Sequence, residues 1–158
     1  MGKETEKIKQ YFPGLKYDKN FKVTSKATSD YNCIAWALQY TDRFMWPNSE
    51  ATAGLDGVYY WPDGIEKNED ISAFVEAFRQ KGYEICTNGD FEEGYRKIAL
   101  YVKPGTTECT HAARQLRNGF WTSKLGSSED IQHGTAFTIQ GVAYGVLGCF
   151  MKKAVDYT

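Results

Sequence analysis

The sequence predicts a single α+β domain, with helices in the first half of the chain and antiparallel strands in the second half. Two segments, 31–41 and 68–84, carry apolar residues at helical spacing. A later segment contains the dipeptide Asn118-Gly119, the strongest short-range hairpin signal. The 158 residues, of which 42% are hydrophobic, suffice for one domain with its own core.

The first predicted helix runs from Tyr31 to Tyr40, with Asp30 as its N-cap. Ile34, Ala37, Leu38 and Thr41 share one face at helical spacing. Cys33 then occupies about the third helical position, with Trp36 and Tyr40 along its side. This places a thiol in the first turn of a short apolar helix.

An aromatic segment, 43–64, follows the helix and contains two Trp-Pro pairs. Proline and glycine interrupt both the helical and the strand period, so we expect a long structured loop. Its rings, Trp46, Tyr59, Tyr60 and Trp61, have two possible roles. They fill a hydrophobic cluster under the loop, or they form a platform on which a sugar or another flat substrate stacks.

The clearest helix lies within 68–84, where Ile71, Phe74, Val75 and Phe78 form one apolar face and Gly82 ends the helix. A short strand is expected at 83–86. The run of five apolar residues with charged ends at 96–103 predicts a central buried strand.

The segment 108–126 predicts a hairpin with a two-residue turn, in which Arg117 lies opposite Phe120. Alternation then places His111 on one face of the first strand, shared with Cys109, Ala113 and Gln115, and with Thr122 and Lys124 of the second strand. The segment 127–134 is expected to be a loop, and 144–153 a last strand.

Composition and charge argue against nucleic-acid and membrane partners. The net charge is −1, from 19 basic and 20 acidic residues, and no basic stripe is present, so we expect no nucleic-acid partner. The charged N-terminus lacks the apolar core of a secretory signal, and no apolar run could span a bilayer. We therefore expect a cytoplasmic protein with no membrane partner. Its four cysteines, none in a CxxC pair, are expected to be free thiols, with no metal and no cofactor.

Cys33 is a candidate nucleophile because the positive end of a helix depresses the pKa of a thiol, and free amides there can hold an oxyanion. A catalytic thiol also needs a base, and the chain has only two histidines. His111, expected on a rigid strand, is better placed than His133 in a polar loop. The competing role for Cys33 is that of a small buried apolar residue.

The order "NC" and short helix, followed by a histidine at the start of a later antiparallel strand, resembles the arrangement of papain-like thiol hydrolases, and the NlpC/P60-type branch most of all. In addition, "NCIAWA", "THAARQL", the Asn-Gly turn, "WTSKLG" and "DIQH" resemble a pattern of uncharacterised bacterial domains. The resemblance implies a papain-like core at 21–158, in which a helix carrying Cys33 packs on an antiparallel sheet, after an N-terminal extension at 1–20.

The same resemblance implies that Cys33 attacks an amide-type carbonyl and that His111 transfers the proton. For the third catalytic residue, Asp130 comes first, His133 is an alternative, and Thr122 and Lys124 orient an imidazole poorly. Substrate or oxyanion contacts are expected from Asn32, Trp36, Lys124 and Trp61. The substrate is a peptide, an isopeptide or a cell-wall amide; a secreted effector is conceivable by analogy only.

Two other functions stay open. One is a non-catalytic module of the same fold that binds a ligand or a protein partner through its aromatic loop. The other is a zinc protein, because Cys109 and His111 are expected on one strand face and Cys33, Cys86 or His133 could complete the site.

Overall fold

The computed structural model describes residues 2–28, 30–47, 58–125, 129–141 and 144–155. Its main element is a seven-stranded sheet in the order β1-β8-β7-β6-β5-β9-β4, in which every neighbouring pair is antiparallel. The strands are β1 (Lys22–Val23), β4 (Glu84–Cys86), β5 (Tyr95–Val102), β6 (Cys109–Gln115), β7 (Trp121–Lys124), β8 (Asp130–His133) and β9 (Val146–Ala154). A separate parallel pair joins β2 (Arg43–Met45) to β3 (Val58–Tyr60).

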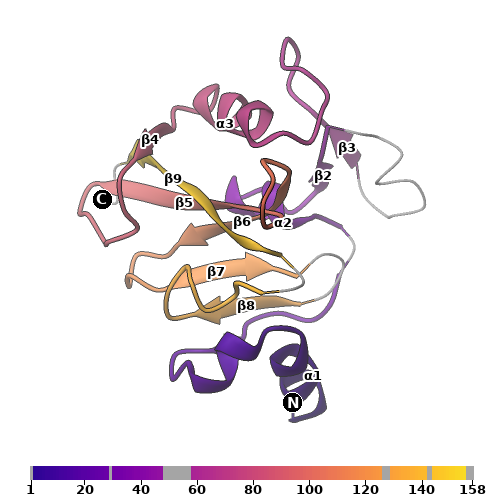
Figure 1. Cartoon of the computed structure of the whole chain (residues 1–158), viewed down its shortest axis with the longest axis vertical. Coiled ribbons are helices and arrows are strands. Elements are labelled where there is room, and N and C mark those ends of the chain that lie inside the picture. The colour runs from indigo at the N-terminus through magenta and orange to yellow at the C-terminus, as the bar shows by residue number, and fades with distance from the viewer. Residues whose placement is uncertain (1, 29, 48–57, 126–128, 142–143, 156–158) are drawn as a thin grey trace.

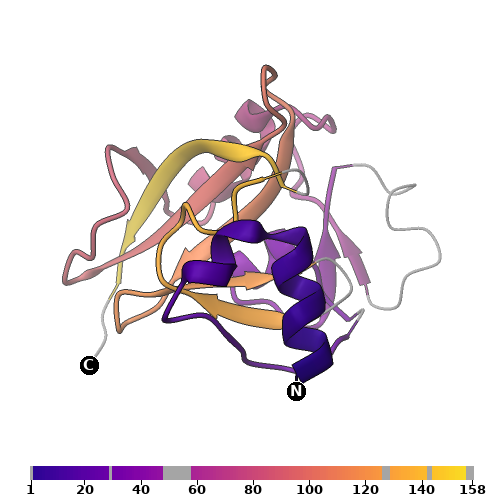
Figure 2. The same ribbon diagram turned by 60° about the horizontal axis from the view of Figure 1, so that its bottom comes forward.

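Helices cover both sides of the sheet (Figures 1 and 2). On one side lie α2 (Cys33–Ala37) and α3 (Ile71–Arg79). On the other side lie α1 (Gly2–Tyr11) and the 3-10 helix η1 (Pro13–Tyr17), which cross in front of β7 and β8 in Figure 2. Thus the segment 1–20, predicted to be an extension, contributes Ile8, Phe12 and Leu15 to the buried interior.

The alternation of β5 separates the interior into two hydrophobic clusters. Ile98 and Leu100 point into the cluster that also holds Cys33, Phe74 and Phe78. We call this side the Cys33 face. Ala99 and Tyr101 point to the opposite side, together with Ala113, Ile131, Leu15 and Phe12. We call that side the His111 face, because His111 pairs with Tyr101 and its ring lies 5.4 Å from the Tyr101 ring.

The predicted fold class, α+β with a papain-like core, is wrong. The structure is mostly a seven-stranded antiparallel sheet with few short helices, 19% of residues being helical and 34% in strands. The helix predicted over Tyr31–Tyr40 is only the five residues of α2, because Gln39 adopts a positive φ of 69° immediately after it. Its N-cap is Asn32 and not Asp30, so Cys33 is the first helical residue.

Other elements follow the sequence more closely. The helix in 68–84 is confirmed as α3, capped by Asp70, whose carboxylate accepts from the Ser72 amide at 3.0 Å. The strands expected at 83–86, 96–103 and 144–153 are confirmed as β4, β5 and β9. The expected loop at 127–134 is wrong in its second half, where β8 pairs with both β7 and β1. Residues 48–57 of the predicted aromatic loop lie outside the described residues.

Candidate functional site

The start of α2 is fixed by the side chain of Asn32. Its Oδ1 accepts from the backbone amides of Ala35 at 3.1 Å and Met45 at 3.0 Å, while Nδ2 donates to the Met45 carbonyl at 2.9 Å. The amide thereby caps the helix and ties β2 to it. This structural role differs from the oxyanion contact predicted for Asn32.

Cys33 is sealed in the core of the Cys33 face, with 6% of its surface exposed. Burial raises the pKa of its thiol to about 11, and this effect exceeds the opposite one of the nearby backbone amides of Ala112 and Ile34. At neutral pH the sulfur is therefore a protonated thiol. This is the environment of a packing residue, in which a nucleophile is not activated.

His111 lies on the opposite side of the sheet and is fully buried there. Its ring stacks on the Tyr144 ring, with centroids 3.9 Å apart and an interplanar angle of 7°. Its Nε2 is 3.0 Å from Ser123 Oγ, which is in turn 2.8 Å from His133 Nε2. The predicted meeting of His111 with Cys33 does not occur, because the sheet itself separates them.

The chain of contacts from His133 to His111 has one consistent set of proton positions. His133 Nδ1 lies 2.8 Å from the Thr135 carbonyl, so it carries a proton and its Nε2 accepts from the Ser123 hydroxyl. Ser123 Oγ then accepts from His111 Nε2. Within the described part of the chain, no donor reaches His111 Nδ1, which is left as a buried acceptor. Both imidazoles are neutral, since burial lowers the pKa of His133 to about 4 and that of His111 well below its usual value.

Two local irregularities of the sheet place Thr122, Lys124 and Cys109 on the opposite face from the one that simple alternation predicts. The β6–β7 turn has three residues, 117–119. The Leu116 amide donates to the Phe120 carbonyl at 2.7 Å, and the Leu116 carbonyl accepts from the Gly119 amide at 2.9 Å. Gly119 has a φ of +89°. Arg114 therefore pairs with Thr122, one residue away from the predicted register. A slip of one residue moves every side chain to the other face. Thr122 and Lys124 accordingly lie on the Cys33 face.

The second irregularity is a β-bulge in β6. Tyr101 pairs with His111, but its neighbour Val102 pairs with Cys109, so Thr110 is the extra residue. Cys109 therefore packs in the cluster of the Cys33 face, away from His111. The half zinc site predicted from these two residues is not formed. Among the described residues, no group of three or more His, Cys, Asp and Glu side chains could hold a metal ion.

Most of the remaining predicted site residues do come together near the start of α2. Lys124 Nζ donates to the Thr28 carbonyl at 2.7 Å and lies 5.2 Å from the centre of the Tyr31 ring. The Tyr31 hydroxyl donates to Asp130 at 2.5 Å. Burial lowers the pKa of Lys124 and raises that of Asp130. Asp130 thus faces α2 and not His111, so it does not orient that imidazole.

Trp36 and Trp61 are also committed to internal contacts. Trp36 Nε1 donates to Thr122 Oγ1 at 3.0 Å, and the Arg114 guanidinium lies 5.0 Å from its ring centre. Trp61 packs edge-on against Phe74 at 5.3 Å, as Trp46 does at 5.2 Å. The described rings of the aromatic segment therefore belong to the core of the Cys33 face.

A surface cleft of about 440 Å³ opens on the His111 face. Three segments line it: the 87–91 part of the β4–β5 loop, the β6–β7 turn and residues 134–137 after β8. Trp121 and Phe150, with ring centres 5.9 Å apart, are its buried aromatic residues. The residues Phe91 and Phe137 are 48% and 55% exposed. We call this site the phenyl cleft.

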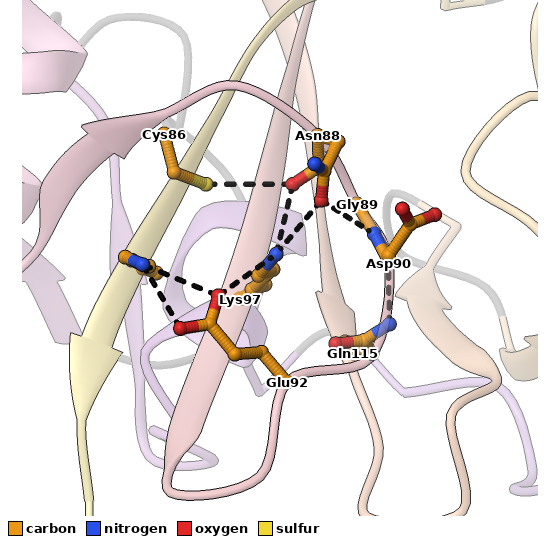
Figure 3. A network of polar contacts seen from close by, with 8 residues as sticks. Cys86, Asn88, Gly89, Asp90, Glu92, Lys97 and Gln115 are labelled. Atoms are coloured by element: carbon orange, nitrogen blue, oxygen red, sulfur yellow. Dashed lines mark hydrogen bonds and ion pairs between the residues drawn. The ribbon is translucent and has the colours of Figure 1, made fainter.

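The loop that forms one wall of the phenyl cleft is held by a buried ammonium group (Figure 3). Lys97 Nζ, 3% exposed, donates to the carbonyl and to Oδ1 of Asn88 at 3.2 and 3.0 Å, and lies 3.5 Å from Glu92. Gln115 Nε2 donates to the Gly89 carbonyl at 2.8 Å. The loop is thus fastened to β5 and β6, which gives the wall a defined shape before any ligand arrives.

Gly89 brings this loop against the aromatic residues of the cleft. A Cβ at this position would lie 2.6 Å from Phe150 Cε1 and 3.0 Å from Trp121 Cζ2. Only glycine allows the backbone to approach the rings so closely. The sequence signal for this site was the stretch "TNGDFEEG", where one phenylalanine stands among turn-forming and acidic residues. The stretch does not by itself predict a site, because isolated exposed rings are common in loops.

Within the described ranges, no helix is long and apolar enough to cross a bilayer. No curated protein and no solved structure matches the chain. One family model does match, over residues 22–152, which include every strand of the sheet except the last two residues of β9. The chain therefore belongs to the family described as Domain of unknown function (DUF7689).

Proposed function

We propose that the chain is a non-catalytic ligand-binding module and that the phenyl cleft is its binding site. The observation that carries the proposal is the pair of half-exposed rings, Phe91 and Phe137, beside a cleft of about 440 Å³. Small-molecule sites are concave, mostly apolar and shaped in advance, with a few placed polar groups. The phenyl cleft has each of these properties.

Binding is favoured over catalysis by the state of the predicted catalytic groups. The Cys33 thiol is protonated and buried, and His111 lies beyond the sheet with a strongly lowered pKa. A thiol hydrolase needs a thiolate, an adjacent base and access for the substrate. The geometry supplies none of the three at Cys33, so amide hydrolysis stays a prediction from the sequence alone.

Fluorescence titration with N-phenyl-1-naphthylamine, a neutral dye that brightens in apolar surroundings, tests the proposal on the full chain. We expect saturable binding with one dye per chain. Replacing both Phe91 and Phe137 by alanine should weaken binding at least about tenfold, because the two walls provide much of the apolar contact.

Ile85→Ala is the matched control. Ile85 is another exposed apolar residue, 53% exposed, and it lines a different groove beside α3 together with Ile65 and Val75. The control variant should bind the dye like the wild type. If Ile85→Ala lost dye binding while the variant with both Phe91 and Phe137 changed to alanine kept it, the site would lie beside α3 and the proposal would be contradicted.

A cytoplasmic location forms part of the proposal. It is supported by the four free thiols, Cys33, Cys86, Cys109 and Cys149, which fit a reducing compartment. Cell fractionation of the native protein tests it.

A further inference from the structure

We infer that the phenyl cleft takes an uncharged carbohydrate of one or two sugar rings. The inference rests on the proposed function and specifies the ligand class. It follows from three properties of the cleft: its charges, its unused hydrogen-bonding groups and its exposed rings.

The charges of the lining residues disfavour anionic ligands. Among the thirteen residues that line the cleft, all within the described chain, none is Lys, Arg or His, and the one ionisable side chain is the exposed Asp90. The ammonium of Lys97, which holds the β4–β5 loop, is buried and bonded to Asn88 and Glu92 (Figure 3). Glu92 is further neutralised by Lys152 at 3.1 Å. Among the lining residues, a phosphate or carboxylate would therefore meet the carboxylate of Asp90 and no cation.

The polar side chains of the cleft have hydrogen-bonding capacity of both kinds left over. Asn88 uses Oδ1 to accept from Lys97 and from the Asp90 amide, which leaves its NH₂ group as a donor. Gln115 uses Nε2, at 2.8 and 3.4 Å from two carbonyls, which leaves Oε1 as an acceptor. No donor in the described part of the chain reaches the Asp90 carboxylate. Sugar hydroxyls donate and accept at once, so they can satisfy such a mixed set.

The exposed rings match the other part of a sugar. A pyranose ring has faces of C–H bonds that are apolar, while its hydroxyls project from its edge. Phe137 is supported in place by edge-on packing on Phe150, with centroids 6.3 Å apart and an angle of 82°. Phe137 is also 55% exposed, so its supported phenyl ring offers a face on which C–H groups can pack. The volume of about 440 Å³ suits one or two such units.

A peptide fits the cleft less well. Extended peptides gain much of their affinity by adding a strand to an open sheet edge. The outer strands here are β1 and β4, whereas Gln115, Trp121 and Phe150 belong to β6, β7 and β9 inside the sheet. A peptide in this cleft would therefore form no backbone ladder.

The test uses the full chain on an array of immobilised neutral oligosaccharides, acidic oligosaccharides and short peptides. Hits are then titrated as free ligands by calorimetry. We expect binding to neutral oligosaccharides, with loss of saturation-transfer signals from one sugar face when the cleft rings are changed. Preference for acidic oligosaccharides or for peptides would overturn the inference.

Phe137→Leu separates the two proposals. Leucine keeps an apolar side chain at the cleft and removes the aromatic face, so sugar affinity should fall about tenfold while naphthylamine affinity changes less than about threefold. Ile85→Ala again serves as the control that should leave both unchanged. Dye binding in the cleft without any sugar binding would contradict the carbohydrate inference but not the proposal that the chain is a binding module. Failure of both ligands would sink both.

Discussion

The Cys33 face and the His111 face are two sides of the same sheet, yet they treat their polar groups differently. On the Cys33 face, the polar side chains near α2 make internal contacts: Trp36 donates to Thr122, and Tyr31 donates to Asp130, whose second oxygen, Oδ1, is buried without a hydrogen-bond partner among the described residues. On the His111 face, Nδ1 of His111 likewise has no partner within the described residues, but the phenyl cleft in addition exposes two phenylalanines and several unused polar groups to solvent.

In this protein, the residues with the most suggestive sequence motifs are not the ones that line the surface cleft. The stretch from Asn32 to Trp36 is rich in chemically suggestive residues, and the fold uses it as core. Residues that carry no motif, such as Phe91 and Phe137, lie at the surface with open space beside them. Burial, more than residue type, decides which side chains can act on solvent-borne molecules.

The largest expected effect is the loss of stability when a buried side chain that covers either face of the sheet is truncated. Phe74→Ala on the Cys33 face should lower the free energy of unfolding by about 3–5 kcal/mol, and Leu15→Ala on the His111 face by about 2–5 kcal/mol, because both side chains are fully buried. Urea denaturation followed by circular dichroism measures both. Tyr17→Ala, at a residue 81% exposed in the same 3-10 helix, should change stability by less than about 0.5 kcal/mol.

The Leu15 value is the critical one. A loss below about 1 kcal/mol would mean that the N-terminal helices do not cover the His111 face in solution. The Cys33 face would then be covered by helices in solution and the His111 face would not.

A smaller effect comes from acid. Burial lowers the pKa of His133 from 6.5 to about 4, so the unfolded chain binds the additional proton between these values. Above about pH 6.5, His133 is neutral in both states and does not reduce the free energy of unfolding. As the pH falls towards 4, protonation of the unfolded chain lowers that free energy, by about 2 kcal/mol at pH 5. His111, whose pKa is also lowered, acts in the same direction.

Comparing the unfolding free energy at pH 7 and pH 5 in the wild type and in His133→Gln tests this origin. The variant has no imidazole to protonate, so the drop between the two pH values should shrink by about 2 kcal/mol. Cys33→Ala, on the other face, should retain the full drop. An unchanged drop in His133→Gln would assign the acid sensitivity to other groups.

The smallest effect concerns the thiol of Cys33. Cys33→Ala should cost only about 1 kcal/mol, since it deletes one buried sulfur atom. In native protein at pH 7, iodoacetamide should modify the half-buried Cys86 well before Cys33, and His111→Ala should not alter the Cys33 rate. Fast labelling of Cys33 that slows in His111→Ala would instead restore the thiol-hydrolase prediction.

Local patterns along the chain located several elements correctly. The apolar face of Ile71, Phe74, Val75 and Phe78 predicted α3, because that spacing stabilises a helix wherever its face is buried. The run at 96–103 predicted β5, and Asn118-Gly119 predicted the β6–β7 hairpin. In each case neighbours in sequence contain the information, so no long-range contact is needed to recognise the element.

Register, face and exposure depended on contacts between distant segments. Gly119 adopts a positive φ in a three-residue turn, and Thr110 is the extra residue of a bulge; either change reverses the face of the side chains beyond it. The segment 130–133 became β8 only because β1 and β7 were there to pair with it. By itself the sequence determined which short segments are helical or extended. The tertiary structure alone decided that Cys33 and His111 are separated by the sheet and that Phe91 and Phe137 meet at a cleft, since such outcomes depend on pairing between strands and not on any one of them.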